Sequence, residues 1–151
     1  MAERKAERVV HAVPTSDGAG VRLSRAIANA ELDKHVLALE SDAGVFRARG
    51  FGFTGSDAAR KTLSEIVSLL KPLGADTIGP QGGGADIGPS VAAAKIPSAS
   101  LETENSKYFL LHHTHADTVD KLDPKDLADN AAAIAFLAYV VADLPAPLPR
   151  Q

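Results

Sequence analysis

The sequence predicts an α/β layer fold, because short apolar runs alternate with longer segments of helical periodicity. Residues 35–39 (His-Val-Leu-Ala-Leu) form an apolar run bounded by charged residues, which is typical of a buried strand. Two longer segments, 57–71 and 124–143, carry apolar residues at helical spacing. The 151 residues are enough for one domain with a hydrophobic core, and no internal repeat is visible.

The first predicted helix follows a region of weak pattern. In the segment 1–30, Pro14, Gly18 and Gly20 break any long element. Glycines then predict a loop after the first strand, at Gly50, Gly52 and Gly55. Ser56 is a favourable N-cap for the helix over 57–71, and Pro72 ends it. The apolar face of this helix comprises Ala59, Leu63, Ile66, Val67 and Leu70.

Shorter elements are predicted in the second half of the chain. Residues 76–78 and 98–101 are predicted as strands, and a short helix over 86–94 lies between them. The Gly82-Gly83-Gly84 run before this helix predicts a flexible loop. It lacks the lysine and hydroxyl residue of a phosphate-binding loop and the spacing of a dinucleotide fingerprint. It is either a plain connector or a loop that approaches a substrate backbone.

The last helix begins at Pro124, because Asp123 and Pro124 combine an N-cap with proline at the first helical position. Its predicted buried face comprises Leu127, Ala131, Ile134, Ala138 and Val141. The proline-rich tail, 145–151, is expected to fray.

Composition restricts the function classes. The net charge of −3 and the pI near 5.9 come without a basic stripe, so nucleic-acid binding is not expected. The chain has no cysteine, so a metal site must use histidine and carboxylate ligands. No apolar run approaches the ~20 residues of a membrane span or forms a signal-peptide core. The chain as written is therefore expected to be cytoplasmic and without a membrane partner.

Three histidines and an aspartate are concentrated in residues 112–118 (His-His-Thr-His-Ala-Asp-Thr). Neutral imidazole is the commonest protein ligand for transition metals, and His113 follows an apolar run. Alternatively, this cluster is a surface turn in which the histidines have no function. Asp42 follows the strand over 35–39 and is a natural hard ligand, or else a loop aspartate that caps a turn. His11 and His35 are predicted to be non-functional.

Four motifs occur in this order: residues 39–44 (Leu-Glu-Ser-Asp-Ala-Gly), 84–87 (Gly-Ala-Asp-Ile), 112–118 with Leu122-Asp123-Pro124, and 138–143 (Ala-Tyr-Val-Val-Ala-Asp). Together they resemble the zinc-dependent aminopeptidase and carboxypeptidase Q-like (plasma glutamate carboxypeptidase) metallopeptidases. The similarity covers about 31–144, the C-terminal part of the catalytic domain. It leaves 1–30 as a non-matching N-terminal segment and 145–151 as a tail.

This resemblance implies a three-layer α/β/α sandwich of the zinc exopeptidase type, incomplete at its N-terminal side. It also implies two zinc ions in the intact active site. Asp42 and His113 would each bind a different zinc ion, and Asp86 would bind substrate. Intact homologues are expected to be secreted or periplasmic, and the substrate is a dipeptide or short peptide.

One part of the family pattern is absent. The resemblance places a Glu-Glu pair, which supplies a ligand and the general base, at Pro14 and Thr15. A His-x-Asp motif is expected further upstream. No catalytic residue is therefore found, and the chain alone is expected to bind zinc weakly and to be inactive, as after a truncation or frameshift. The alternative is a non-catalytic, peptidase-derived binding or assembly domain. Two kinds of partner are also expected as alternatives: further copies of this chain in a homo-oligomer, or a chain that supplies the missing half.

Overall fold

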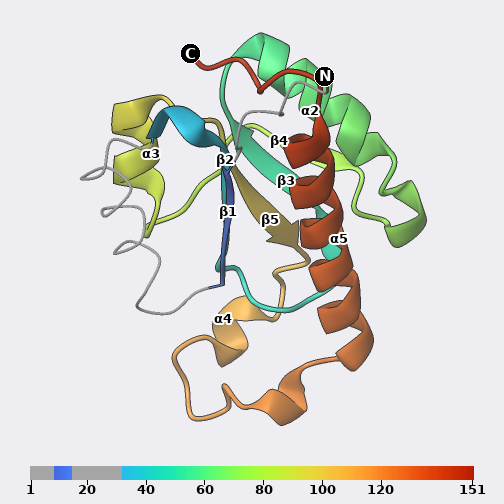
Figure 1. Ribbon diagram of the computed structural model, residues 1–151. Helices are drawn as coiled ribbons and strands as arrows, with labels where there is room; N and C mark the ends of the chain where they lie inside the picture. The colour runs from blue at the N-terminus through green and yellow to red at the C-terminus, as the bar shows by residue number, and fades with distance from the viewer. Residues whose placement is uncertain (1–8, 15–31) are drawn as a thin grey trace.

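The computed structural model describes residues 32–151 and the backbone of residues 9–14. Its centre is a five-stranded sheet in the order β1-β2-β5-β3-β4 (Figure 1). β1, β2 and β5 run parallel to one another, while β3 is antiparallel to β5 and parallel to β4. The strands are Val9–Pro14 (β1), His35–Ser41 (β2), Ala48–Thr54 (β3), Thr77–Gly79 (β4) and Ser98–Thr103 (β5).

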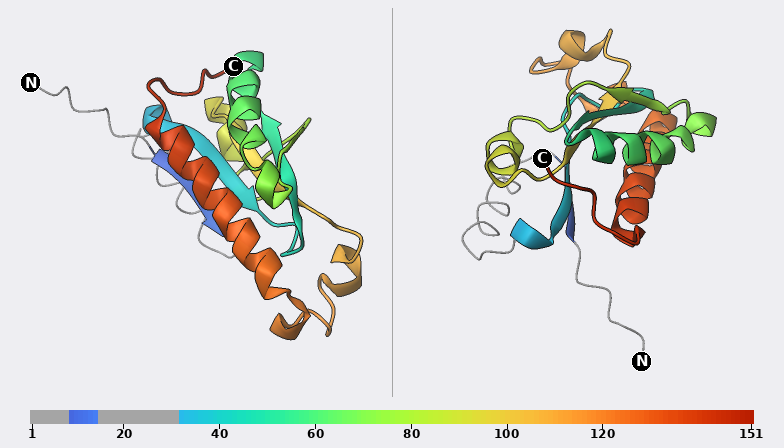
Figure 2. Two further views of the ribbon diagram at one scale, coloured as in Figure 1. Left: turned by 90° about the vertical axis from the view of Figure 1, so that its right-hand side faces the viewer. Right: turned by 90° about the horizontal axis from the view of Figure 1, so that it is seen from above.

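Helices cover both faces of the sheet, which confirms the predicted α/β/α sandwich (Figures 1 and 2). α2 and α5 pack on one face and α3 on the other. The helices are Asp57–Ser68 (α2), Gly88–Ala94 (α3), Tyr108–Leu111 (α4) and Pro124–Asp143 (α5). Short 3-10 turns occupy Leu32–Lys34, Lys71–Leu73 and Val119–Lys121. No helix in the described part of the chain is long and apolar enough to cross a membrane.

The two faces of the sheet differ in chemistry because side chains alternate along each strand. The face toward α2 and α5 is apolar and carries Leu37, Leu39, Phe51, Phe53, Ala99 and Leu101. On the opposite face, Ala38 packs with Ile87 and Val91 beside α3. Toward the carboxyl ends of β2 and β5, the same face carries the polar side chains of Glu40, Ser100 and Glu102.

Two helix starts form as predicted. Ser56 accepts a hydrogen bond from the Ala59 N–H at 3.2 Å, and Asp123 accepts one from the Lys125 N–H at 2.7 Å. These side chains satisfy amide groups that have no partner within the helix.

The prediction of a loop at Gly50 and Gly52 is wrong, because both residues lie inside β3. Gly52 is required by a close approach of the chain: a Cβ there would lie 1.9 Å from the backbone oxygen of Gln81. Phe51 and Phe53 alternate with these glycines and are fully buried. This alternation of buried residues is typical of a strand, but glycine is uncommon inside strands and therefore indicated a loop.

The expected fraying of the tail is also wrong. Leu148 is only 3% exposed, and Ser56 donates a hydrogen bond to the carbonyl of Pro149 at 2.8 Å. The Arg150 guanidinium donates to the carbonyls of Leu32, His35 and Ala94. The tail is therefore fixed to the start of β2 and to the end of α3.

The buried face of α5 differs from the predicted one by a rotation of the helix. Ala133, Leu137 and Val141 are fully buried, whereas Leu127 is 49% exposed. Asn130 is buried on the same face, where its side-chain nitrogen donates to the Phe46 carbonyl at 2.9 Å. The helix is rich in alanine on all sides, so its sequence alone defines the face poorly.

This corrected face predicts a contrast between two leucines. Leu137→Ala is expected to destabilise the fold by about 2–5 kcal/mol, because it leaves a cavity against the sheet. Leu127→Ala, the same change at an exposed position of α5, is expected to cost less than about 0.5 kcal/mol. Urea denaturation of both variants measures the difference. Equal losses of unfolding free energy in the two variants would contradict the burial of Leu137 and the exposure of Leu127.

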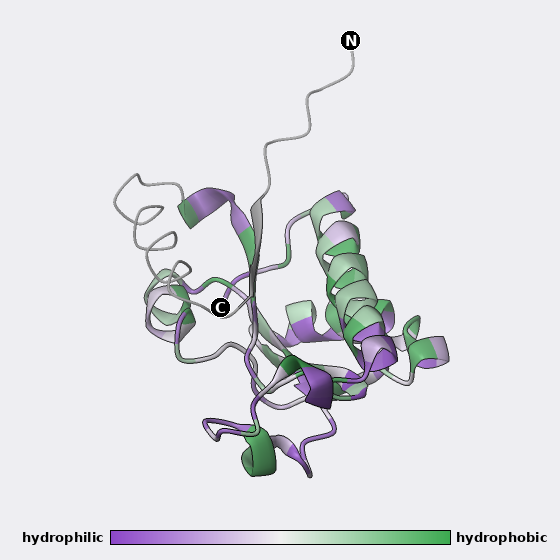
Figure 3. Cartoon of the chain, turned by 90° about the horizontal axis from the view of Figure 1, so that it is seen from below, coloured by the Kyte–Doolittle hydropathy of each residue, from purple (hydrophilic) through white to green (hydrophobic). Residues whose placement is uncertain are grey.

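α4 presents an apolar surface. Phe109 is 79% exposed and Leu110 is 71% exposed, and Figure 3 shows α4 as a short hydrophobic helix. We expect the chain to associate at concentrations on the order of tens of micromolar, as exposed apolar surface does. Light scattering should show larger species for the native chain and fewer for Phe109→Ser with Leu110→Ser. A monodisperse monomer of the native chain would contradict this expectation.

Candidate metal site at the carboxyl edge of the sheet

The segments that carry Asp42 and His113 leave the sheet at the same edge. β2 and β5 are parallel neighbours, with Glu40 opposite Ser100 in the ladder. Asp42 directly follows β2, and the chain after β5 leads through α4 to His113. The carboxyl edge of parallel strands is the usual location of ligand sites in α/β folds.

Tyr108 connects these two segments. Its hydroxyl donates to the backbone oxygen of Asp42 at 3.4 Å. Its ring stacks on His112 with ring centroids 4.5 Å apart, and His112 stacks on His113 at 3.8 Å. A column of three rings therefore joins the Asp42 loop to His113.

His113 has an unusual backbone. Its φ of 57° lies in the left-handed region, which non-glycine residues rarely adopt. The following turn holds this conformation, because the Thr114 hydroxyl donates to the Leu111 carbonyl at 2.8 Å and accepts from the Ala116 N–H at 3.1 Å. Backbone strain of this kind is concentrated at functional sites. The imidazole of His113 is exposed.

Two carboxylates act on the Tyr108 hydroxyl. Burial, followed by the negative charges of Asp42 and Asp117, raises the pKa of Tyr108 above its usual value. The phenol therefore remains a protonated donor over the ordinary pH range. Asp42 and Asp117 are thus close enough to Tyr108 for their charges to act on its hydroxyl.

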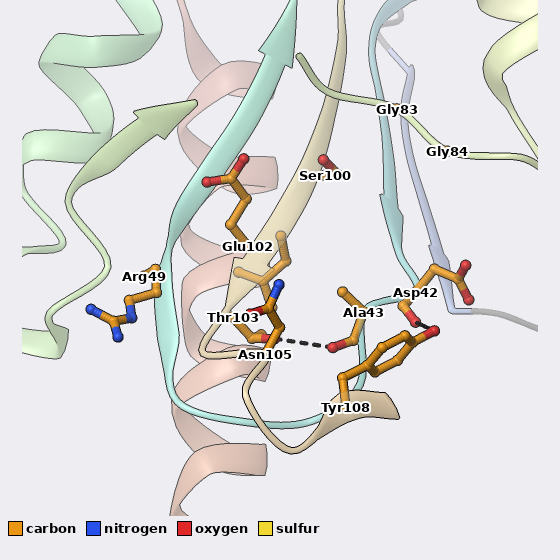
Figure 4. Close-up of a pocket in the computed structure, with 11 residues that line it drawn as sticks. Asp42, Ala43, Arg49, Gly83, Gly84, Ser100, Glu102, Thr103, Asn105 and Tyr108 are labelled. Carbon is orange, nitrogen blue, oxygen red and sulfur yellow. Dashed lines mark hydrogen bonds between the residues drawn. The ribbon is translucent and has the colours of Figure 1, made fainter. Parts of the chain in front are cut away.

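Asp42 lines a cleft of about 530 Å³, which Figure 4 shows between β5 and the loop with Gly83 and Gly84. This volume is in the range of small-ligand pockets. The described residues that line it are Asp42, Ala43, Arg49, Gly83, Gly84, Ser100, Leu101, Glu102, Thr103, Asn105 and Tyr108. Of the three predicted site residues, Asp42 is thus in the cleft lining, while Asp86 and His113 are outside it.

Asp86 lies on an exposed loop that Glu40 anchors. The Glu40 side chain, 1% exposed, accepts hydrogen bonds from the backbone N–H groups of Asp86 at 3.5 Å and Ile87 at 3.2 Å. A Cβ at Gly84 would lie 2.1 Å from the Glu40 carboxyl carbon. The glycine run therefore lies closely against the protein's own sheet, whereas the sequence left open a plain connector or a loop that approaches substrate.

The described residues do not form a complete zinc site. Among them, no three histidine, aspartate or glutamate side chains are grouped closely enough to hold a metal ion. A catalytic zinc usually has three protein ligands plus water. Asp42 and His113 have suitable chemistry for single ligands, but no reaction step can be derived from them alone.

Tyr108 and Glu40 are parts of the site that the sequence did not predict. Tyr108 precedes His112 by four residues, a spacing that places two rings on one side of a helical turn. Glu40 precedes Asp42 by two residues, so in a strand both side chains point to the same face. Both spacings were visible, but neither indicates a partner without the fold.

On its fold, the described part of the chain is of the M28 peptidase type. The structure matches the peptidase M28 precursor from Shewanella amazonensis SB2B with a TM-score of 0.77 and 34% identity, over 87% of this chain and 30% of that one. The aminopeptidase from Aneurinibacillus sp. strain AM-1 matches with a TM-score of 0.57 and 25% identity, over 89% of this chain and 32% of that one.

Within that class, the chain is similar to carboxypeptidase Q, which confirms the resemblance that the motifs predict. Mouse carboxypeptidase Q is 43% identical over 122 residues, which cover 81% of this chain and 26% of the mouse protein. The chain thus spans about a quarter of the length of the curated relatives it matches. No family model matches the chain.

Proposed function

We propose that this chain carries part of the active site of a di-zinc metalloexopeptidase, a hydrolase that cleaves a peptide bond in a dipeptide or short peptide. Asp42 and His113 each supply a ligand to a different zinc ion, and Asp86 contacts the substrate. Zinc, when bound, supplies a Lewis acid that polarises the scissile carbonyl. The observation that carries this proposal is the ring column from Asp42 through Tyr108 to His113.

The chain's own groups have further roles in this proposal. The cleft beside Asp42 is large enough for a dipeptide. Glu40 holds the loop that bears Asp86, and the protonated Tyr108 hydroxyl fixes the backbone of Asp42. The family-like segment 31–144 provides all of these groups.

We further propose that the chain is inactive alone. The backbone of Pro14 pairs with Ser41 in the ladder of β1 and β2, directly before Asp42. By the resemblance, this is where the Glu-Glu pair belongs, and proline neither binds zinc nor accepts a proton. Thr15 lies outside the described residues. The same observation supports the second candidate, a peptidase-derived domain that binds or assembles without catalysis.

A zinc titration of the chain by calorimetry tests the ligand assignment. We expect weak binding that Asp42→Asn and His113→Ala each reduce at least about tenfold, since loss of a direct ligand should cost no less than loss of a supporting residue. Asp76→Asn, which removes an exposed carboxylate from the loop before β4, should bind zinc like the native chain. Unchanged binding in both site variants would refute the assignment.

A further inference from the structure

The polar face of the sheet holds a second set of groups beside Asp42. In the ladder between β3 and β5, Gly52 lies opposite Ser100 and Gly50 opposite Glu102. Glycine leaves β3 without side chains there, so the Glu102 carboxylate extends across β3. A Cβ built at Gly79 would lie 2.3 Å from Glu102 Oε1, which places that carboxylate beside the end of β4.

These groups line the cleft but have no partner within the described part of the chain. Ser100, Glu102 and Asn105 all contribute to its wall, and their side chains form no hydrogen bond or ion pair with a described residue. Figure 4 shows Ser100 and Glu102 on the same side of β5. Glu102 is half-buried, and a carboxylate partly removed from water is stabilised by a counter-charge.

No described residue that lines the cleft neutralises Glu102. Arg49 is the cationic side chain among the described lining residues, and it forms no ion pair with Glu102. In Figure 4 its guanidinium is directed away from that carboxylate. A ligand that fills the cleft therefore meets a carboxylate that no described residue pairs, with a hydroxyl and an amide as further hydrogen-bonding groups.

We propose that Glu102 is a specificity-determining residue, which binds a cationic group of the ligand, an ammonium or a guanidinium, while the rest of the ligand extends toward Asp42. Ser100 and Asn105 accept further hydrogen bonds from this group through their side-chain oxygens. The identification of the ligand as a peptide rests on the proposed function. The cation has two possible sources, the α-amino group of the peptide or a basic side chain.

A metal-free titration followed by amide chemical shifts tests the proposal with three probes. Leucinamide carries only an α-ammonium, N-acetyl-lysinamide carries only a side-chain ammonium, and N-acetyl-leucinamide carries no charge. At least one charged probe should bind about tenfold more tightly than the neutral probe, with shifts at Ser100, Glu102 and Asn105. The tighter of the two charged probes identifies the source of the cation.

Variants make the result specific to one carboxylate. Glu102→Gln preserves the size of the side chain and should remove the preference for charged probes, with a well-dispersed spectrum as evidence of folding. Glu65→Gln removes the same charge from the exposed surface of α2 and should keep the preference. Equal binding of all three probes, no shift in the cleft, or a preference that survives Glu102→Gln would each overturn the proposal. The probes bind without zinc, so failure of the zinc titration would refute the proposed function separately.

Discussion

Gly84→Ala is expected to destabilise the domain by about 1–3 kcal/mol, a large effect for one added methyl group. The new Cβ would lie 2.1 Å from the Glu40 carboxyl carbon and 2.1 Å from one of its oxygens. Glu40 cannot easily move, since it is buried and accepts hydrogen bonds from the Asp86 and Ile87 N–H groups. Urea denaturation of the native chain and the variant measures the loss.

A double-mutant cycle shows whether Glu40 causes this loss. Glu40→Ala alone should cost about 1–3 kcal/mol, because it leaves two amide groups without an acceptor. It also removes the side chain that the new methyl group meets, so the double variant should be more stable than the sum of the single losses predicts. Gly88→Ala is the matched control, since its added Cβ would have no atom within 4 Å beyond its chain neighbours and the backbone of its own helix. If Gly84→Ala were as mild as Gly88→Ala, the close packing of this loop on Glu40 would be contradicted.

Saturating zinc is expected to give this chain no dipeptidase turnover above background. Proton transfer by a positioned general base contributes ~10²–10⁴-fold to rate, and Pro14 stands where the resemblance expects an acid-base group. Release of an amino acid from a dipeptide, followed by chromatography, measures the activity. Turnover that disappears in His113→Ala would contradict the proposed inactivity.

Restoring the missing carboxylates provides a second readout. Pro14→Glu with Thr15→Glu should raise zinc affinity about tenfold relative to the native chain, because a further ligand joins Asp42 at the same edge of the sheet. The gain should be lost when Asp42→Asn is added. An unchanged affinity would indicate that β1 does not carry the position that the resemblance assigns to the Glu-Glu pair.

Local signals allowed part of the fold to be predicted from the sequence. The Ser56 cap and the Asp123-Pro124 pair act within a few residues of their own helices, so they work without the rest of the fold. The glycines of β3 were misread as a loop because their cause is distant in sequence. Gly52 has no side chain because the chain at Gln81 lies directly on it.

The candidate site likewise has a part that the sequence predicted and a part that depends on the fold. Short motifs were enough to select Asp42 and His113, but their connection depends on the Tyr108 ring and on the pairing of β2 with β5. The Glu102 subsite was not predicted, since it arises from strand pairing that sets an acidic side chain opposite glycine. The pairing of strands determines which side chains lie beside one another, and this pairing cannot be predicted from a single sequence.

The attachment of Arg150 has a consequence for the kinetics of folding. Its guanidinium reaches the carbonyl of His35, 115 residues earlier in the chain, at 3.0 Å. A contact over so long a loop is entropically costly and is expected to form after the main folding barrier. Interactions absent from the transition state govern how fast a native protein opens, rather than how fast it forms. The Arg150 contacts would thus slow the unfolding of the native protein without changing the rate at which it folds.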